Sequence, residues 1–363
     1  MAKSAKASKA STKDKRPNRE TNAAVLRQAM VKRLPRRVSA SGQMVLPAAP
    51  SLCDHYLESL HKYFATLGRV FTKEETLHMR GILEKKLTEA YTASPYARVV
   101  VHYETDAPPK TSLTYRMTVN VSTIGDEYDN WVKTRTPPFF GAHPDAKVMD
   151  MARALGAPAD VPVLDIGAGT GRNTLPLARE GFKVDAIELT PALASILREE
   201  VAKESLAAQV YEADALAGSV SLPERHYALV FLSEVIASHI RNGDQLRALF
   251  EGAAEALREG GFLLFNAFLP KEGYKPDATA RELSQVFWCN LFTRGELSAA
   301  LQGLPFELVS DEEAAAYEQE HLPAEAWPPT GWYADWAAGL DLFDVPRDSV
   351  PMELRWLVYK RRA

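Results

Sequence analysis

The 363-residue sequence is poor in cysteine, and the two that it has, Cys53 and Cys289, lie far apart in the chain. This count excludes a disulfide framework and a zinc site built from several thiolates. The sequence also lacks a run of about 18 apolar residues, the length that a membrane-spanning helix needs. No apolar segment follows the first positive charges, as it would in a secretory signal. We therefore expect a protein that does not cross a membrane and that works in a reducing, cytoplasmic setting.

Acidic residues are scarce at the start of the chain. Residues 1–37 carry twelve Lys or Arg and two acids, although the whole sequence has a net charge of −4. This stretch has few large apolar side chains, so we predict a disordered basic tail over residues 1–49. The tail could bind nucleic acid or another acidic partner, or it could only solubilise the protein. We favour the second interpretation because no aromatic residues are interleaved with the charges.

The most informative stretch is V-P-V-L-D-I-G-A-G-T-G, residues 161–171. Its apolar, β-branched start predicts a short buried parallel strand. Gly167, Gly169 and Gly171 then end the strand, and a helix is predicted to begin at about residue 172. Because glycine has no Cβ, a ligand can lie directly against the main chain of such a loop, beside the free N–H groups of a helix start. The pattern predicts a site for a nucleotide-type cofactor.

The spacing of the glycines is G-x-G-x-G and not the G-x-G-x-x-G of dinucleotide-binding proteins. An acid, Asp165, precedes the first glycine by two residues, and a second, Glu188, ends the next predicted strand. These features resemble the class I S-adenosylmethionine-dependent methyltransferases, whose motif is D-x-G-x-G-x-G. The wording G-T-G-R-N-T-L-P-L-A-R-E-G-F is similar to the tellurite-resistance type and related small-molecule branches. The resemblance implies S-adenosylmethionine as cofactor, with Glu188 accepting hydrogen bonds from both ribose hydroxyls.

Strands and helices alternate regularly from about residue 146 onward, which predicts a doubly wound parallel sheet. Ligands of such sheets bind beyond the carboxyl ends of the strands, where Asp214 and Ser233 are expected together with the glycine loop. The resemblance implies seven strands, the last antiparallel between the fifth and sixth, and a contact of Asp214 with the adenine amino group. It also implies that Tyr128, on a helix before the first strand, closes over the cofactor, with Trp131 beside the acceptor. An ordinary core role for both aromatics is the alternative.

The loop after residues 227–232 reads S-E-V-I-A-S-H and contains the candidate catalytic residues Glu234 and His239. In-line methyl transfer depends on alignment, and a general base is needed only when the nucleophile carries a proton. The wording resembles the E-V-x-E-H of some O-methyltransferases and small-RNA methyltransferases, some of which bind magnesium. Because Ala237 and Ser238 replace the middle acid, we predict no metal site. A plain structural role for His239 remains open.

The motif lies in the second of two predicted regions. Residues 50–125 are predicted to form an accessory α+β region, and residues 126–363 the methyltransferase domain. An insertion over about residues 311–350 holds three of the six tryptophans, of which Trp332 and Trp336 are candidates to contact the acceptor. Aromatic side chains must pack on something, so they either wall the site or join the two regions.

Together these features predict methyl transfer from S-adenosylmethionine to a small-molecule acceptor through an O, N, S or other chalcogen nucleophile. The alternatives are an RNA or protein methyltransferase that uses the basic tail, a nicotinamide-dependent dehydrogenase, and a cofactor-binding protein without turnover. A homodimer is left open by the sequence, and no membrane partner is expected.

Overall fold

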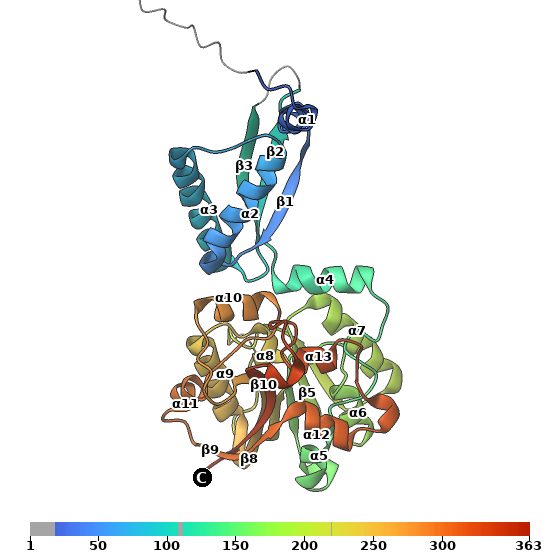
Figure 1. Ribbon diagram of the computed structural model, residues 1–363. Helices are drawn as coiled ribbons and strands as arrows, with labels where there is room; N and C mark the ends of the chain where they lie inside the picture. Colours follow the sequence, from blue (N-terminus) through green and yellow to red (C-terminus); the bar gives the residue numbers. More distant parts are fainter. Residues whose placement is uncertain (1–18, 108–111, 219) are drawn as a thin grey trace, which may run out of the picture.

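The computed structural model describes residues 19–107, 112–218 and 220–363, and these contain two separate β-sheets (Figure 1). The smaller sheet lies in the N-terminal part of the chain and the larger one in the C-terminal part. Helix α4 (Ile124–Thr134) follows the small sheet and lies between the two parts. Thr123 and Asp126 form a capping box at its start, which fixes where this helix begins.

The small sheet has three antiparallel strands in the order β1 (Ser41–Pro47), β2 (Arg98–Thr105) and β3 (Leu113–Asn120). Helices α2 (Cys53–Thr66) and α3 (Lys73–Ala93) pack on it. The apolar side chains of α3 recur at helical spacing, and Met79, Leu83 and Leu87 are fully buried. We call residues 41–120 the accessory region, because they bury a core of their own.

The prediction of a disordered tail over residues 1–49 is wrong for part of that stretch. Residues 23–31 form helix α1 (Ala23–Val31), residues 34–37 form a 3-10 turn, and β1 pairs along its length with β2. Met44 and Leu46 of β1 pack against the core of the accessory region, which gives this strand a physical reason to be ordered. Helix α1, in contrast, has no buried residue. Residues 1–18 lie outside the described part of the chain.

The large sheet has seven strands in the order β6, β5, β4, β7, β8, β10, β9. Neighbours from β6 to β8 are parallel, and β10 runs antiparallel between β8 and β9. This is the predicted doubly wound, seven-stranded arrangement, including the antiparallel last strand. The bounds are β4 Val163–Ile166, β5 Val184–Glu188, β6 Ala208–Glu212, β7 Tyr227–Leu232, β8 Leu257–Pro270, β9 Phe306–Glu313 and β10 Met352–Arg361.

Helices cover both faces of this sheet. Helices α5, α6, α12 and α13 contribute to the core on one face, and α8, α9 and α11 to the core on the other. The sheet therefore lies between two layers of buried apolar side chains. The bounds are α5 Ala146–Ala154, α6 Thr174–Arg179, α7 Pro191–Glu204, α8 Val235–His239, α9 Gly243–Ala256, α10 Ala278–Val286, α11 Arg294–Leu301, α12 Ala314–His321 and α13 Tyr333–Ala337.

The insertion before the last strand begins later than expected, because β9 continues to Glu313. It contains α12 and α13 and packs on the sheet: Trp336 makes an edge contact with Phe268 of β8, with the ring centroids 4.9 Å apart. No helix within the described ranges has the length and apolarity needed to cross a membrane.

Candidate functional site

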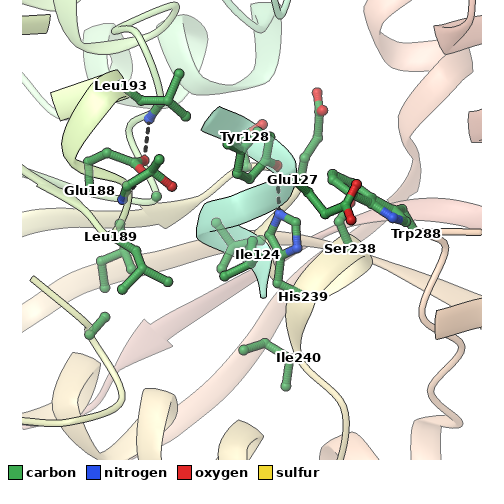
Figure 2. A pocket seen from close by; sticks show the side chains of 18 of the residues that line it. Ile124, Glu127, Tyr128, Glu188, Leu189, Leu193, Ser238, His239, Ile240 and Trp288 are labelled. Atoms are coloured by element: carbon green, nitrogen blue, oxygen red, sulfur yellow. Dashed lines mark hydrogen bonds between the residues drawn. The ribbon is translucent and has the colours of Figure 1, made fainter. Parts of the chain in front are cut away.

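A cavity of about 760 Å³ lies at the carboxyl ends of the parallel strands and extends to Tyr96 of the accessory region. Residues of α4 line it as well (Figure 2). It brings together side chains that are far apart in the sequence, as a crevice at the strand ends of a doubly wound sheet should. All but one of the predicted site residues line it. These are Tyr128, Trp131, Asp165, Gly167, Gly169, Glu188, Asp214, Ser233, Glu234, His239, Trp332 and Trp336.

The glycine loop forms one wall. Gly167 and Gly171 have φ angles of 82° and 91°, a region that residues with a Cβ rarely adopt. A Cβ at Gly167 would collide with Val235, so glycine is required there for both reasons. Gly171 is the predicted site residue that does not line the cavity. A Cβ on it would meet Leu175 and Leu197, and its requirement for glycine therefore comes from packing against α6 and α7.

Two acids hold this loop in place. Glu188, at the end of β5, accepts hydrogen bonds from the N–H of Gly169 at 2.8 Å and from the N–H of Thr190 at 2.7 Å. Burial raises the pKa of Glu188, and these N–H donors oppose the rise. Asp165, at the end of β4, accepts a hydrogen bond from the hydroxyl of Thr174 at 2.6 Å. Its carboxyl group therefore ties the strand to the start of α6.

Asp214 lies in the turn that follows β6 and lines the same cavity. Its carboxylate accepts a hydrogen bond from the N–H of Leu216 at 2.8 Å, which fixes the turn. Glu188 and Asp214 thus follow adjacent parallel strands, β5 and β6, as predicted.

A buried ion cluster lies where β4 and β7 end. The Arg172 guanidinium pairs with Asp145 and, at 2.7 Å, with Glu234. Ser233 donates its hydroxyl to Asp145 at 2.6 Å. Burial raises the pKa of Glu234, while Arg172 opposes the rise. Glu234 also has a φ of 62°, which is unusual for a residue with a side chain, and its N–H donates to Asn266.

His239, at the end of α8, lies between two tyrosines. Its Nε2 lies 2.9 Å from the hydroxyl of Tyr128, and its Nδ1 lies 3.0 Å from the hydroxyl of Tyr96 (Figure 2). Burial lowers the pKa of His239 to about 4, so the ring is neutral near pH 7. A neutral imidazole has one N–H and one acceptor nitrogen. One tyrosine therefore donates to the ring and the other accepts from it.

Trp288 is the centre of an aromatic cluster around His239. Its ring stacks on Trp131 at 5.4 Å with an interplanar angle of 1°, and it meets Tyr96, Tyr128 and His239 edge-on at 5.2 to 5.5 Å. We call Tyr96, Tyr128, Trp131 and Trp288 the aromatic cluster. The φ of Trp288 is 57°, a strained value for a bulky side chain, and an observed strain of this kind is characteristic of functional sites.

The insertion supports this cluster from behind. The indole N–H of Trp336 donates to the carbonyl of Trp288 at 2.8 Å, and Trp332 meets Trp336 edge-on. Both rings line the cavity, and Trp336 belongs to the core beneath the sheet. The printed contacts of both tryptophans are with the large sheet, the insertion and Trp288, and a contact of either one with an acceptor stays a prediction.

Sequence reasoning missed Asp145, Arg172, Tyr96 and Trp288. Arg172 directly follows the last glycine of the motif, and this position next to the glycine loop could have marked it as a site residue. Tyr96 lies in the loop between α3 and β2, and Trp288 follows α10, so neither is near a motif. Only the folded chain brings them to His239. Among the described residues no group of three or more His, Cys, Asp or Glu side chains is arranged to hold a metal ion.

Comparison with known proteins identifies the C-terminal part. Residues 163–261, from β4 into β8, match the model of a family described as a methyltransferase domain. This segment of the chain is thus similar to methyltransferase domains. This agrees with the motif, the order of the strands and the reversed β10.

Solved structures similar to this chain include two methyltransferases, of which the first shares its fold. Phosphoethanolamine N-methyltransferase 2 of Haemonchus contortus, in complex with phosphomonomethylethanolamine and S-adenosylhomocysteine, aligns with a TM-score of 0.50 and 17% identity, covering 73% of this chain and 69% of that one. Geranyl diphosphate C-methyltransferase of Streptomyces coelicolor aligns with a TM-score of 0.47 and 15% identity, over 60% of this chain and 80% of that one.

A curated relative matches over a short segment only. A probable ribosomal RNA small subunit methyltransferase A of Methanosphaera stadtmanae is 48% identical over 44 residues, which is 12% of this chain and 16% of that protein. The chain therefore spans about a sixth of the length of this relative.

Proposed function

We propose that this protein transfers the methyl group of S-adenosylmethionine to a small-molecule acceptor that binds between the large sheet and the accessory region. One observation carries the proposal. A single cavity contains the glycine loop, the acids that follow β5 and β6, and the His239–tyrosine arrangement. Cofactor and acceptor can therefore meet in one enclosed space, which in-line transfer requires.

The residues of the cavity fit the nucleoside part of the cofactor. Glu188 is a buried carboxylate that already accepts two N–H bonds and lies at the end of β5, where the ribose hydroxyls of the cofactor would bind. Asp214 follows the neighbouring strand, in place for the adenine amino group. Gly167 and Gly169 leave the main chain open to close approach, which a side chain would prevent.

The ion cluster fits the amino-acid end of the cofactor. Arg172 would bind its carboxylate, and Glu234 would bind its ammonium group. We propose this binding role for Glu234, in place of the base expected from the sequence, because its carboxylate is paired with Arg172 at 2.7 Å. When bound, the cofactor supplies a methyl group on a sulfonium. The residues of the protein then have to place the acceptor and take up any proton that it loses.

His239 is the proposed path for the proton that the acceptor loses. Its neutral ring can accept a proton on one nitrogen while it releases one from the other. Tyr128 and Tyr96 contact the two nitrogens, so the three side chains form a continuous hydrogen-bonded chain.

Calorimetry tests the cofactor part. The protein should bind S-adenosylmethionine and S-adenosylhomocysteine and should bind neither NAD nor NADP. Glu188→Ala should weaken binding by about 1.5–3 kcal/mol, because it removes hydrogen bonds to a charged acceptor. Glu199→Ala, on the exposed face of α7, is the matched control and should bind normally. Tight nicotinamide binding without sulfonium binding would overturn the proposal and favour the dehydrogenase.

A transfer experiment tests the acceptor part. A cell extract incubated with the protein and methyl-labelled S-adenosylmethionine should gain label in the small-molecule fraction. Label confined to RNA or to protein would instead support the alternative that uses the basic N-terminal residues. A His239→Ala control should lower the label while leaving binding of S-adenosylhomocysteine unchanged.

A further inference from the structure

Glu127 faces the acceptor side of the cavity and has no role in the function proposed so far. It lies on α4, one residue before Tyr128, and lines the cavity. Its carboxylate accepts a hydrogen bond from the hydroxyl of Ser122 at 2.7 Å. Within the described ranges no Lys or Arg forms an ion pair with it. A half-buried carboxylate at a cavity wall is thus available to a positively charged ligand (Figure 2).

The aromatic cluster beside Glu127 is electrostatically suited to a cation. The faces of indole and phenol rings carry negative charge density and attract ammonium and guanidinium groups. The cluster already binds one such group, because the guanidinium carbon of Arg135 lies 3.6 Å from the ring centre of Trp131. Trp288 is held beside it in a strained backbone conformation, and its carbonyl is fixed by Trp336.

The charged groups that line the cavity also favour a positively charged ligand. Six carboxyl groups and three guanidinium groups line it. Arg172 is paired with acids, Arg241 donates to the carbonyl of Tyr91 and to Gln285, and Arg135 lies on Trp131. Carboxyl groups therefore outnumber guanidinium groups along the cavity wall, and Glu127 is the carboxyl group that α4 contributes.

We propose that the acceptor is an amine, whose positively charged form is bound by the carboxylate of Glu127 and the rings of the aromatic cluster. The inference rests on the proposed function and names the substrate class of the same site. A methylated amine carries a positive charge as product, so the site would stabilise the charge that passes from sulfur to nitrogen during the reaction.

The step balances as follows for a primary amine. The bound ammonium first loses one proton, which leaves through Tyr128, His239 and Tyr96 to water. The nitrogen lone pair then forms the N–C bond while the S–C bond breaks and leaves its electron pair on sulfur. The nitrogen becomes positively charged as the sulfonium becomes a neutral thioether, so net charge is conserved.

A matched pair of probes tests the inference without knowledge of the natural acceptor. Choline and 3,3-dimethylbutan-1-ol have the same shape, but only choline carries a charge. Titrations by ligand-observed NMR, with S-adenosylhomocysteine at saturation, should show choline binding at least about tenfold more tightly. Glu127→Gln and Trp288→Leu should each weaken choline binding about tenfold and leave the affinity for S-adenosylhomocysteine unchanged. Asp129→Asn, on the same helix but outside the cavity, is the control and should bind choline normally.

The outcomes separate the two proposals. Three results would overturn the amine acceptor: equal binding of both probes, no binding of choline, or choline binding that neither substitution weakens. If S-adenosylhomocysteine still binds normally in these cases, the proposed methyl transfer is not contradicted. Failure of the unmodified protein to bind S-adenosylhomocysteine would overturn the proposed function itself. Thermal melting of each variant confirms that a lost affinity does not reflect a lost fold.

Discussion

The position of His239 shows how one side chain can be fixed by two regions of the chain. Tyr128 comes from α4 and Tyr96 from the loop before β2, and they contact opposite nitrogens of the ring. Because the ring is neutral, the two contacts require opposite hydrogen-bond roles from the two hydroxyls. The tautomer of His239 therefore depends on which tyrosine donates, and a change at either residue alters the ring without touching it directly.

Burial of His239 should make folding stability depend on pH. Its pKa is about 4 in the folded protein, whereas a histidine of an unfolded chain ionises near 6.5. Between these values the unfolded chain binds more protons, so the free energy of unfolding falls as the pH is lowered. From pH 7 to pH 5 the loss should be about 1–2 kcal/mol. Denaturant unfolding of the wild type and of His239→Gln at both pH values measures it.

The comparison between variants isolates this contribution. Buried carboxyl groups with raised pKa, such as Asp165 at about 7, change stability in the opposite direction, but they are present in both proteins. His78→Gln, at an exposed position of α3, controls for the substitution itself. An unchanged pH dependence in His239→Gln would show that the ring is not protonated on unfolding in this range, contrary to the prediction.

Among the elements, those whose signals are local could be predicted from the sequence. The strand at Val163–Ile166, the glycine loop and the helix from Pro191 to Glu204 each have apolar pattern, turn residues and caps within a few positions. Strand β1 was not predicted because Ser41, Gly42 and Pro47 are residue types that are typical of loops, so the segment was assigned to the tail. Its stability comes from pairing with β2, more than 50 residues later in the chain.

The same reasoning explains the incomplete prediction of the site. Glu188, Asp214 and His239 follow strands whose order a repeating α/β pattern determines. Trp288 reaches the cavity only because its backbone adopts a left-handed conformation after α10, and no sequence pattern marks such a residue. The partner of a buried side chain is a tertiary property, so Tyr96 could not be assigned from its neighbours in sequence.

Two truncations distinguish the basic N-terminal stretch from the strand that follows it. Removal of residues 1–33 should leave the melting temperature unchanged, because α1 has no buried residue. Removal of residues 1–47 also deletes β1 and exposes the edge of β2. It removes the contacts that Met44 and Leu46 make with the core of the accessory region. This should cost about 3–5 kcal/mol and lower the melting temperature by several degrees. Calorimetric melting of both proteins is the measurement, and equal melting temperatures would contradict the structural role of β1.

At the scale of the whole molecule, the accessory region and the large sheet share one site. Ser51 bonds Glu282 of α10, Tyr96 bonds His239, and Arg241 reaches Tyr91. Each part has a core of its own, so these contacts are polar links between two bodies and not an extension of one core. Interfaces of this type allow relative motion. The acceptor side of the cavity is the part that such motion would open.

Arg241 is the link through which this coupling can be tested. Its Nη2 donates to the carbonyl of Tyr91 at 2.6 Å, its Nε donates to Gln285 at 3.0 Å, and its guanidinium lies 5.1 Å from the ring centre of Tyr91. Arg241→Ala removes a charged donor from a partly buried carbonyl, a loss of about 1.5–3 kcal/mol. Local opening at the interface should then become about 10- to 100-fold more frequent.

Hydrogen exchange measured by mass spectrometry reads this opening directly. In Arg241→Ala, peptides that cover residues 89–97 and 235–245 should exchange faster, because both segments meet at the interface. Peptides that cover residues 163–188 should be unchanged, since the glycine loop and Glu188 lie on the cofactor side of the cavity, and S-adenosylhomocysteine should bind with its normal affinity. Arg198→Ala, which removes an exposed ion pair with Glu212, is the matched control. If the interface peptides exchange as in the wild type, Arg241 is not needed to hold the accessory region in place. If exchange instead rises throughout the large sheet, the two parts unfold as one unit, and the accessory region cannot open independently to admit an acceptor.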